Sequence, residues 1–257
     1  MKKILALVLA LAMMAVLACS AIAEQPTYHF EIVSKGFQST YWQAVLKGTE
    51  ARTKEINDEA GYEKITFQFV GPDAESNVAQ QVSQFESAVN ASPAAIGFAS
   101  VDQEAFVDLI AQAQSKNIPI IGFDSGVPGA PEGAVYANAS TDNYAAGGVA
   151  AEGMWAKIKD RIAAAEGQVR IGEVNQEATG ESVTNRGKGF IDKIIELAAA
   201  EGWGCAVIGN EYYVNGTTGA VVPEADAKII IEVRVPSATY VDLCATEASV
   251  ILNEEDT

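Results

Sequence analysis

The sequence contains one histidine and three cysteines among its 257 residues, and this scarcity argues against several kinds of site. Transition-metal ions are usually held by histidine and cysteine side chains at close spacing, and His29 has no such neighbours. We therefore expect no metal ion. Cys19 falls in an N-terminal apolar run, so Cys205 and Cys244 remain, too few for a disulfide scaffold. They either pair with each other or, as we favour, stay buried as thiols.

Recognisable catalytic patterns are also absent. There is no Gly-x-Ser-x-Gly motif, and Arg186-Gly-Lys-Gly189 lacks the spacing of a phosphate-binding loop and does not directly follow an expected strand. His29 falls inside the first expected strand rather than at its exit, so it is poorly placed as a catalytic base. We therefore predict that the protein is not an enzyme and that it uses no cofactor.

Basic residues are few as well. The sequence has 17 lysines and arginines against 34 aspartates and glutamates, which gives a formal net charge of −17. Such a surface repels phosphate backbones and anionic lipids. We therefore expect no nucleic-acid partner and no attachment to a membrane surface through charge. The simpler role of the acidic residues is to keep the protein soluble.

The one long apolar run lies at the N-terminus, where Met1-Lys2-Lys3 precedes Ile4–Leu17. A charged start and an apolar run shorter than the roughly 20 residues of a membrane span are typical of a secretory signal. Ala21-Ile22-Ala23 favours cleavage that removes residues 1–23, and a lipoprotein box ending at Cys19 is the alternative. Either processing site predicts an exported protein, located in the periplasm or on the outer face of the cytoplasmic membrane.

Apolar runs and amphipathic helical patterns alternate through the first half of the mature chain. Strands that are apolar along their whole length are typical of a parallel sheet covered by helices on both faces. The pattern predicts an α/β lobe over residues 24–137. Its expected strands are 30–34, 65–70, 94–98 and 119–123, and its expected helices begin at Thr40, just after Asn77 and just after Asp102.

A second unit of the same kind occupies residues 138–257. Gly147-Gly148, early in its first helix, predicts that another backbone comes close there. Residues 215–219 are rich in turn formers and leave their conformation open. The expected helices are 144–165, 182–200 and 240–253, and the expected strands are 168–174, 205–209 and 228–235.

Polar side chains follow the first expected strand, where ligands bind in an open α/β sheet. Ser34, Lys35, Gln38 and Ser39 come directly before an aromatic pair, Tyr41-Trp42, in the first turn of the next helix. An aromatic pair beside polar groups suits a sugar ring, which has an apolar face and a polar rim. Packing of both rings in the core is the competing interpretation.

A carboxylate follows the fourth expected strand. Asp124, with Ser125 after it, can accept two hydrogen bonds from neighbouring hydroxyl groups, and charge-assisted bonds are strong. A turn capped by Asp124 is the alternative. We interpret Asp73 and Asp102, which follow the second and third strands, as helix caps rather than ligands.

These residues belong to five segments whose order and spacing match those of a known protein family. Together with the leader, they resemble the type I periplasmic sugar-binding proteins, the soluble substrate-binding components of ABC importers. The matching segments are Ser34–Trp42, Gly71–Asn77, Ile118–Gly126, Ala139–Gly147 and Asn185–Phe190.

The resemblance implies an α/β fold of the periplasmic-binding-protein type I class, with two doubly wound parallel-sheet lobes, the second incomplete. The lobes would be joined by a hinge of three chain crossings, with a sugar or polyol bound between them and delivered to an ABC permease in the membrane. We expect the full-length protein to be a monomer. The ligand-binding residues that follow are Ser34, Lys35, Gln38, Ser39, Tyr41, Trp42, Asp124, Ser125, Asn138 and Arg186.

Several departures leave parts of this hypothesis open. Thr40 stands in place of a proline, and Ser125 in place of an arginine, so the sugar is not identified. A surface salt bridge is the alternative role for Arg186. The chain ends soon after a helix, whereas family members continue, so we expect roughly the last quarter to be missing, with poor stability and weak affinity as the result.

Two other roles fit the same lobes. One is a sensor module that presents its bound ligand to a chemoreceptor or a sensor kinase. The other is the sensor core of a transcription regulator, which the leader and the lack of a helix-turn-helix before Phe30 argue against.

Overall fold

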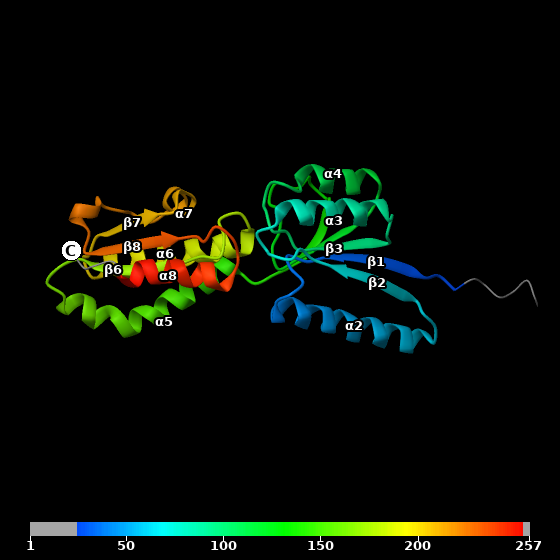
Figure 1. The fold of residues 1–257 in the computed structure, drawn as a ribbon, viewed down its shortest axis with the longest axis horizontal. Helices are drawn as coiled ribbons and strands as arrows, with labels where there is room; N and C mark the ends of the chain where they lie inside the picture. The colour runs from blue at the N-terminus through cyan, green and yellow to red at the C-terminus, as the bar shows by residue number, and fades with distance from the viewer. Residues whose placement is uncertain (1–24, 254–257) are drawn as a thin grey trace, which may run out of the picture.

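The computed structural model describes residues 25–253, which form two lobes lying end to end along the long axis of the molecule (Figure 1). The expected secretory signal, with both of its cleavage alternatives, lies outside the described residues. In the described part of the chain, no helix combines the length and the apolar character needed to cross a membrane.

The first lobe is built on a five-stranded parallel sheet with the strand order β2-β1-β3-β4-β5. Helices cover both faces, with α2 on one side and α3 and α4 on the other (Figure 1). The elements are β1 (Tyr28–Val33), α2 (Thr40–Ala60), β2 (Ile65–Val70), α3 (Val78–Asn90), β3 (Ala95–Phe98), α4 (Val107–Ser115), β4 (Ile120–Phe123) and β5 (Val135–Ala139).

The strand order places a ligand crevice in this lobe. The chain passes from β1 to β2 on one side and then returns to place β3 on the other side of β1, so the strand order reverses at β1. Ligands of open α/β sheets bind outside the carboxyl ends of the strands at such a switch point. The segments after Val33 and Phe98 both begin there, because these two residues are paired in register.

Local capping explains why α2 begins beside that crevice. The Ser39 hydroxyl accepts a hydrogen bond from the Trp42 backbone N–H at 3.4 Å, so the helix starts with Thr40 as predicted. The helix ends at Gly61, whose φ of 74° is the left-handed conformation that glycine adopts without strain. The aromatic pair is thereby fixed in the first turn.

Two expected helix caps are wrong. The Asp102 carboxylate accepts from the backbone N–H groups of Glu104 and Ala105, but it closes a separate turn, and α4 begins only after the buried Phe106. For α3, the capping side chain is Asn77, which accepts from the backbone of Gln80. The side chain of Asp73 is left exposed at the edge of the crevice.

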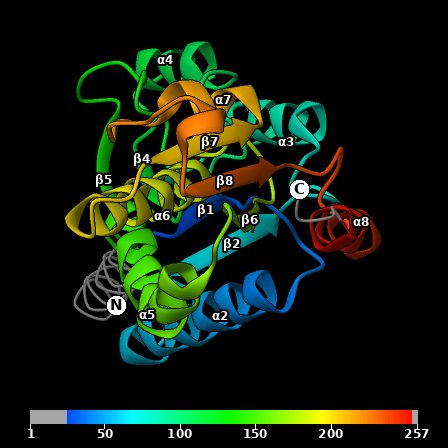
Figure 2. The ribbon, with the colours of Figure 1, turned by 90° about the vertical axis from the view of Figure 1, so that its left-hand side faces the viewer.

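The second lobe has a three-stranded parallel sheet with β8 between β6 and β7. Five of the six residues of β8 are buried, as expected for a central strand. Figure 2 shows α8 across β6 from α5 and α6. The elements are α5 (Asn143–Ala164), β6 (Val169–Val174), α6 (Glu181–Ala200), β7 (Cys205–Gly209), α7 (Glu211–Gly216), a 3-10 turn (Glu224–Asp226), β8 (Ile229–Arg234) and α8 (Val241–Asn253).

The two cysteines among the described residues are both free. Cys205 is buried, as we favoured, and burial raises the pKa of its thiol to about 11. Cys244 is half-buried, so the expectation of a buried thiol is wrong for this residue. It lies on α8, a helix with no buried residue.

One covalent crossing joins the lobes within the described residues, through the segment 140–142 between β5 and α5. The hinge of three crossings expected from the resemblance is therefore not present in this part of the chain. β5 continues to Ala139 in the first sheet, two residues beyond the predicted lobe boundary. The relative position of the lobes thus depends largely on non-covalent contacts.

Helices α5 and α6 pack backbone to backbone, as Gly147-Gly148 predicted. A Cβ at Gly147 would lie 2.1 Å from the backbone oxygen of Arg186. A Cβ at Gly189 would lie 2.0 Å from the backbone oxygen of Tyr144. Side-chain motion cannot relieve either clash, because the opposing atoms belong to the backbone.

Gly147→Ala should therefore destabilise the second lobe by about 1–3 kcal/mol, the usual cost of overpacking. The matched control is Gly153→Ala in the same helix, where a Cβ would meet nothing within 4 Å. The control should gain about 0.5–1 kcal/mol from its better helix propensity. Urea unfolding followed by far-ultraviolet circular dichroism measures both changes, and equal stability of the two variants would contradict the close packing.

Candidate ligand site between the lobes

The lobes meet where the strand exits of the first lobe face one segment of the second. This segment, residues 175–180 between β6 and α6, is called the β6–α6 loop below. The loop and the first turn of α6 contact the residues that follow β3 and β4. The backbone N–H of Gln103 donates to the Thr179 oxygen (3.1 Å), that of Ser182 to the Ser125 hydroxyl (3.2 Å) and that of Gly126 to the Glu181 carboxylate (2.7 Å).

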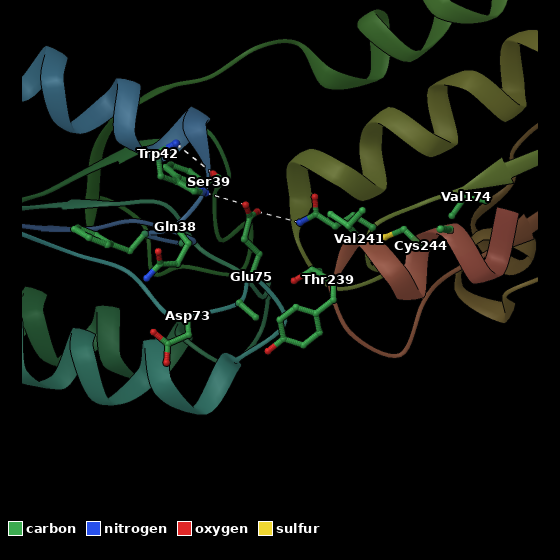
Figure 3. A pocket seen from close by; sticks show the side chains of 15 residues that line it. Gln38, Ser39, Trp42, Asp73, Glu75, Val174, Thr239, Val241 and Cys244 are labelled. Carbon is green, nitrogen blue, oxygen red and sulfur yellow. Dashed lines mark hydrogen bonds between the residues drawn. The ribbon is translucent and has the colours of Figure 1, made fainter.

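An open cavity of about 870 Å³ lies beside this contact. Figure 3 shows that its wall comes from the exits of β1 and β2 on one side, and from β6 and α8 on the other. Gln38, Ser39 and Trp42 of the predicted site line it, together with Asp73 and Glu75. We call it the interlobe cavity.

Trp42 does not present a free ring face in this structure. Its side chain is 1 % exposed, and its indole N–H donates to the Glu75 carboxylate at 2.8 Å. Tyr41 and Phe123 both pack edge-on against it, with ring centroids 4.8 and 6.2 Å away. The competing interpretation of core packing thus describes much of the Trp42 environment.

Tyr41 and Asp124 are brought together. The Tyr41 hydroxyl donates to the Asp124 carboxylate at 2.9 Å, although 83 residues separate them in the sequence. Burial, together with the Asp124 charge, raises the pKa of Tyr41 to about 12. The positive charge of Arg186, in the second lobe, acts against this shift and lowers the pKa of Tyr41. The Arg186 guanidinium also donates a hydrogen bond to the Asn143 side chain.

Four other predicted residues lie elsewhere. The Ser34 hydroxyl donates to two backbone oxygens of its own lobe, and Lys35 is 1 % exposed and paired with Glu177. Ser125 and Asn138 line a second, smaller cavity of about 320 Å³ behind Gly126. The structure therefore divides nine of the ten predicted residues among the interlobe cavity, the Tyr41–Asp124 pair, the second cavity and buried contacts, and Arg186 lies across from the Tyr41–Asp124 pair in the second lobe.

Apart from Arg186, no residue on the second-lobe side was assigned to the site by the sequence analysis. Gln176 and Glu177 follow β6 directly, so their place after a strand was visible, but nothing in the sequence indicated their partners. The part of α8 that lines the interlobe cavity, including Cys244, carries no sequence signal for a site.

The chemistry available here is that of recognition. The interlobe surface offers hydroxyl, amide and carboxylate groups beside aromatic rings, which suits a polyhydroxylated ligand. Among residues 25–253, no cluster of histidine, cysteine, aspartate or glutamate could hold a metal ion.

The chain belongs to the family described as the periplasmic binding protein domain, which it matches over residues 30–222. The family consists of extracytoplasmic binding proteins rather than enzymes. None of the curated proteins matches the chain. The expected fold class, α/β with parallel sheets of the periplasmic-binding-protein type I kind, is confirmed.

Solved structures supply nearer comparisons. The chain is 32 % identical, with a TM-score of 0.62, to a protein of Brachyspira murdochii described as an ABC transporter, LacI family transcriptional regulator; the match covers 87 % of this chain and 62 % of that one. It is 27 % identical (TM-score 0.54) to an ABC transporter solute-binding protein of Agrobacterium vitis with D-fucose bound, covering 72 % and 68 % of the two chains.

A third structure shows the fold alone. The periplasmic component of an ABC-type sugar transport system from Hahella chejuensis is 22 % identical, with a TM-score of 0.64, and the match covers 89 % of this chain and 67 % of that one. The chain thus spans about two thirds of the length of these relatives.

One buried carboxylate next to the β6–α6 loop titrates near neutral pH. Glu173 accepts a hydrogen bond from the Asn175 amide at 2.6 Å, and its second carboxylate oxygen has no partner. Burial raises the pKa of Glu173 from 4.5 to about 7, because it disfavours the charged form.

The folded protein therefore binds a proton here more tightly than the unfolded chain. Its contribution to stability is present below pH 4.5 and is lost as the pH rises through about 7. Glu173→Gln should be more stable than the parent at pH 8, by up to about 3 kcal/mol, with little difference at pH 4.5.

Chemical unfolding at several pH values measures this difference. Glu166→Gln is the matched control, since Glu166 is exposed and makes the same change of charge. A stability difference that does not vary with pH would show that the pKa of Glu173 is the same in the folded and unfolded protein.

Proposed function

We propose that the protein binds a sugar or polyol between its two lobes and delivers it to an ABC permease. The observation that carries the proposal is the hydrogen-bonded pair Tyr41–Asp124, which stands at the strand exits of the first lobe and faces Arg186 of the second. Carboxylate and guanidinium groups form strong hydrogen bonds with hydroxyl groups. An aromatic ring beside them can cover the apolar face of a sugar.

Family membership supports the same proposal. The relative from Agrobacterium vitis is an ABC transporter solute-binding protein with D-fucose bound. Its similarity to this chain makes a neutral monosaccharide the first ligand to test. Export through the expected leader, as a free protein or through Cys19, fits a receptor that meets its ligand outside the cytoplasm.

In this proposal, Tyr41 and Asp124 exchange their mutual hydrogen bond for bonds to ligand hydroxyl groups. Arg186, which donates to Asn143 in the same lobe, closes on the ligand from the other side. Gln38 and Ser39 are exposed on the wall of the interlobe cavity and add polar contacts.

A panel of pentoses, hexoses and polyols that includes D-fucose tests binding by calorimetry and by melting shifts. We expect at least one member to bind, and no binding by any member would contradict the proposal. Gene context tests delivery separately, because neighbouring permease and ATPase genes support import, whereas a neighbouring sensor kinase gene supports signalling.

Asp124→Asn should weaken binding of any such sugar by at least about tenfold, because the charged acceptor is lost. Asparagine is the suitable replacement because Asp124 has a φ of 57°, a conformation that asparagine tolerates. Asp160→Asn, on the exposed side of α5, makes the same change of charge away from the site. Affinity that survives Asp124→Asn unchanged would remove this residue from the site.

A further inference from the structure

Glu75 holds one group from each lobe. It lies in the loop between β2 and α3, and one carboxylate oxygen accepts from the Trp42 indole N–H at 2.8 Å. The other oxygen accepts from the Gln176 side-chain amide, in the β6–α6 loop, at 3.0 Å. The dashed lines in Figure 3 follow this path from the first lobe to the second.

A buried ion pair lies next to this path. The Lys35 ammonium is 3.0 Å from the Glu177 carboxylate and 3.9 Å from that of Glu75. Lys35 is 1 % and Glu177 5 % exposed, so both groups have lost nearly all of their water. The Ser182 hydroxyl, at 3.4 Å, is a further partner of the ammonium.

The two charges belong to different lobes, so their contact depends on the docking of the lobes. Lys35 follows β1 and Glu177 follows β6, so separation of the lobes would return both charges to water. A buried charge without its partner is strongly unfavourable. Water must therefore enter when the pair breaks, and the pair resists partial opening.

The backbone is shaped to allow the contact. A Cβ at Gly180 would lie 2.3 Å from the Glu177 carboxylate and 3.2 Å from the Lys35 ammonium. Any other residue at this position would displace the carboxylate from its lysine. The glycine thus lets the β6–α6 loop close over Lys35.

We propose that Glu75 is a positioning residue that couples the docking of the lobes to the orientation of Trp42. Gln176 holds the second oxygen of the carboxylate only when the lobes are docked, and the carboxylate then fixes the indole. The Lys35–Glu177 pair keeps the β6–α6 loop in place. The inference rests on the proposed function only in treating Trp42 as part of the sugar site.

A purely structural role for Glu75 predicts a different response of Trp42 to changes in the second lobe. If Glu75 only supports Trp42 within the first lobe, changes in the second lobe leave the indole untouched. The hydrogen exchange rate of the Trp42 indole N–H distinguishes the two, because this proton is the one that Glu75 holds. The protein has three tryptophans, so 15N-tryptophan labelling gives three indole signals, and Trp42→Phe identifies the relevant one.

The decisive variant is Gln176→Ala, which removes the second-lobe partner and leaves Glu75 intact. Without any sugar, we expect exchange of the Trp42 indole proton to become about tenfold faster, since a hydrogen bond to a charged group is lost. Gln112→Ala, at an exposed position of α4, should change nothing. An unchanged rate in Gln176→Ala would overturn the proposal.

Swapping the two side chains at positions 75 and 176 controls for a general loss of structure. Glu75→Gln keeps an oxygen that can accept from Trp42, but it replaces the charged acceptor with a neutral one and weakens the bonds to Trp42 and to Gln176, so exchange should accelerate. Adding Gln176→Glu restores an acceptor opposite the new amide group with the net charge unchanged, and should return the rate to within about twofold of the parent. Failure of this rescue, with both variants folded, would also overturn the proposal.

The sugar arm separates this inference from the proposed function. If a sugar binds, its Kd should rise in Gln176→Ala by the same factor as the exchange rate. If no sugar binds while exchange responds as expected, the proposed function fails and the positioning role of Glu75 stands. If a sugar has the same Kd for the parent and for Gln176→Ala, the contact of Glu75 with the second lobe has no effect on the site, and this result would contradict the positioning role.

Discussion

The buried contact between Lys35 and Glu177 is the interaction on which the arrangement of the lobes depends. One covalent segment joins the lobes within residues 25–253, so their relative position is set by what they touch. The remaining contacts at this junction are hydrogen bonds to the β6–α6 loop, to the first turn of α6, to Tyr212 and to Thr239, and each contributes modestly in net terms. The ion pair differs because both of its charges are almost completely buried, so partial opening that leaves either of them dry and unpaired is strongly unfavourable.

Topology explains why this contact falls where a ligand would bind. All strands of the first sheet are parallel and its order reverses at β1, so polar groups after several strands converge at one edge. The second lobe presents the corresponding end of β6. Two pairs of side chains therefore join the lobes here. Lys35 and Glu177 form the buried ion pair, and Glu75 and Gln176 form a hydrogen bond and also line the interlobe cavity.

Periodicity and turn chemistry predicted most elements of the fold. The strand 65–70 has the predicted ends, and α2 begins at Thr40 because Ser39 caps it. The prediction was wrong for the start of α4. Asp102 accepts hydrogen bonds from the backbone of Glu104 and Ala105 in a separate turn, and in the sequence such a turn looks the same as a helix cap. Short-range patterns cannot distinguish those two uses of one carboxylate.

The candidate site was less accessible to sequence analysis, for a physical reason. Tyr41 and Asp124 were placed at strand exits, and their contact follows from parallel topology. The partner of Lys35 is 142 residues away and depends on how two separately folded lobes dock. Sequence spacing carries no information about that docking, so the pairing of Lys35 with Glu177 could not be predicted.

The polar character of the junction also bears on motion. Interfaces that are small and polar permit relative movement of domains, whereas large apolar ones resist it. Opening this junction would expose groups that water solvates well, including the serine hydroxyls and backbone amides around Ser125 and Ser182. Separation of the lobes then costs mainly the ion pair and its neighbouring bonds, and a ligand that bridges the same groups can replace them. The hydrogen-bonding and charged groups that hold the two lobes together are thus of the same kind as those that would bind a polyhydroxylated ligand.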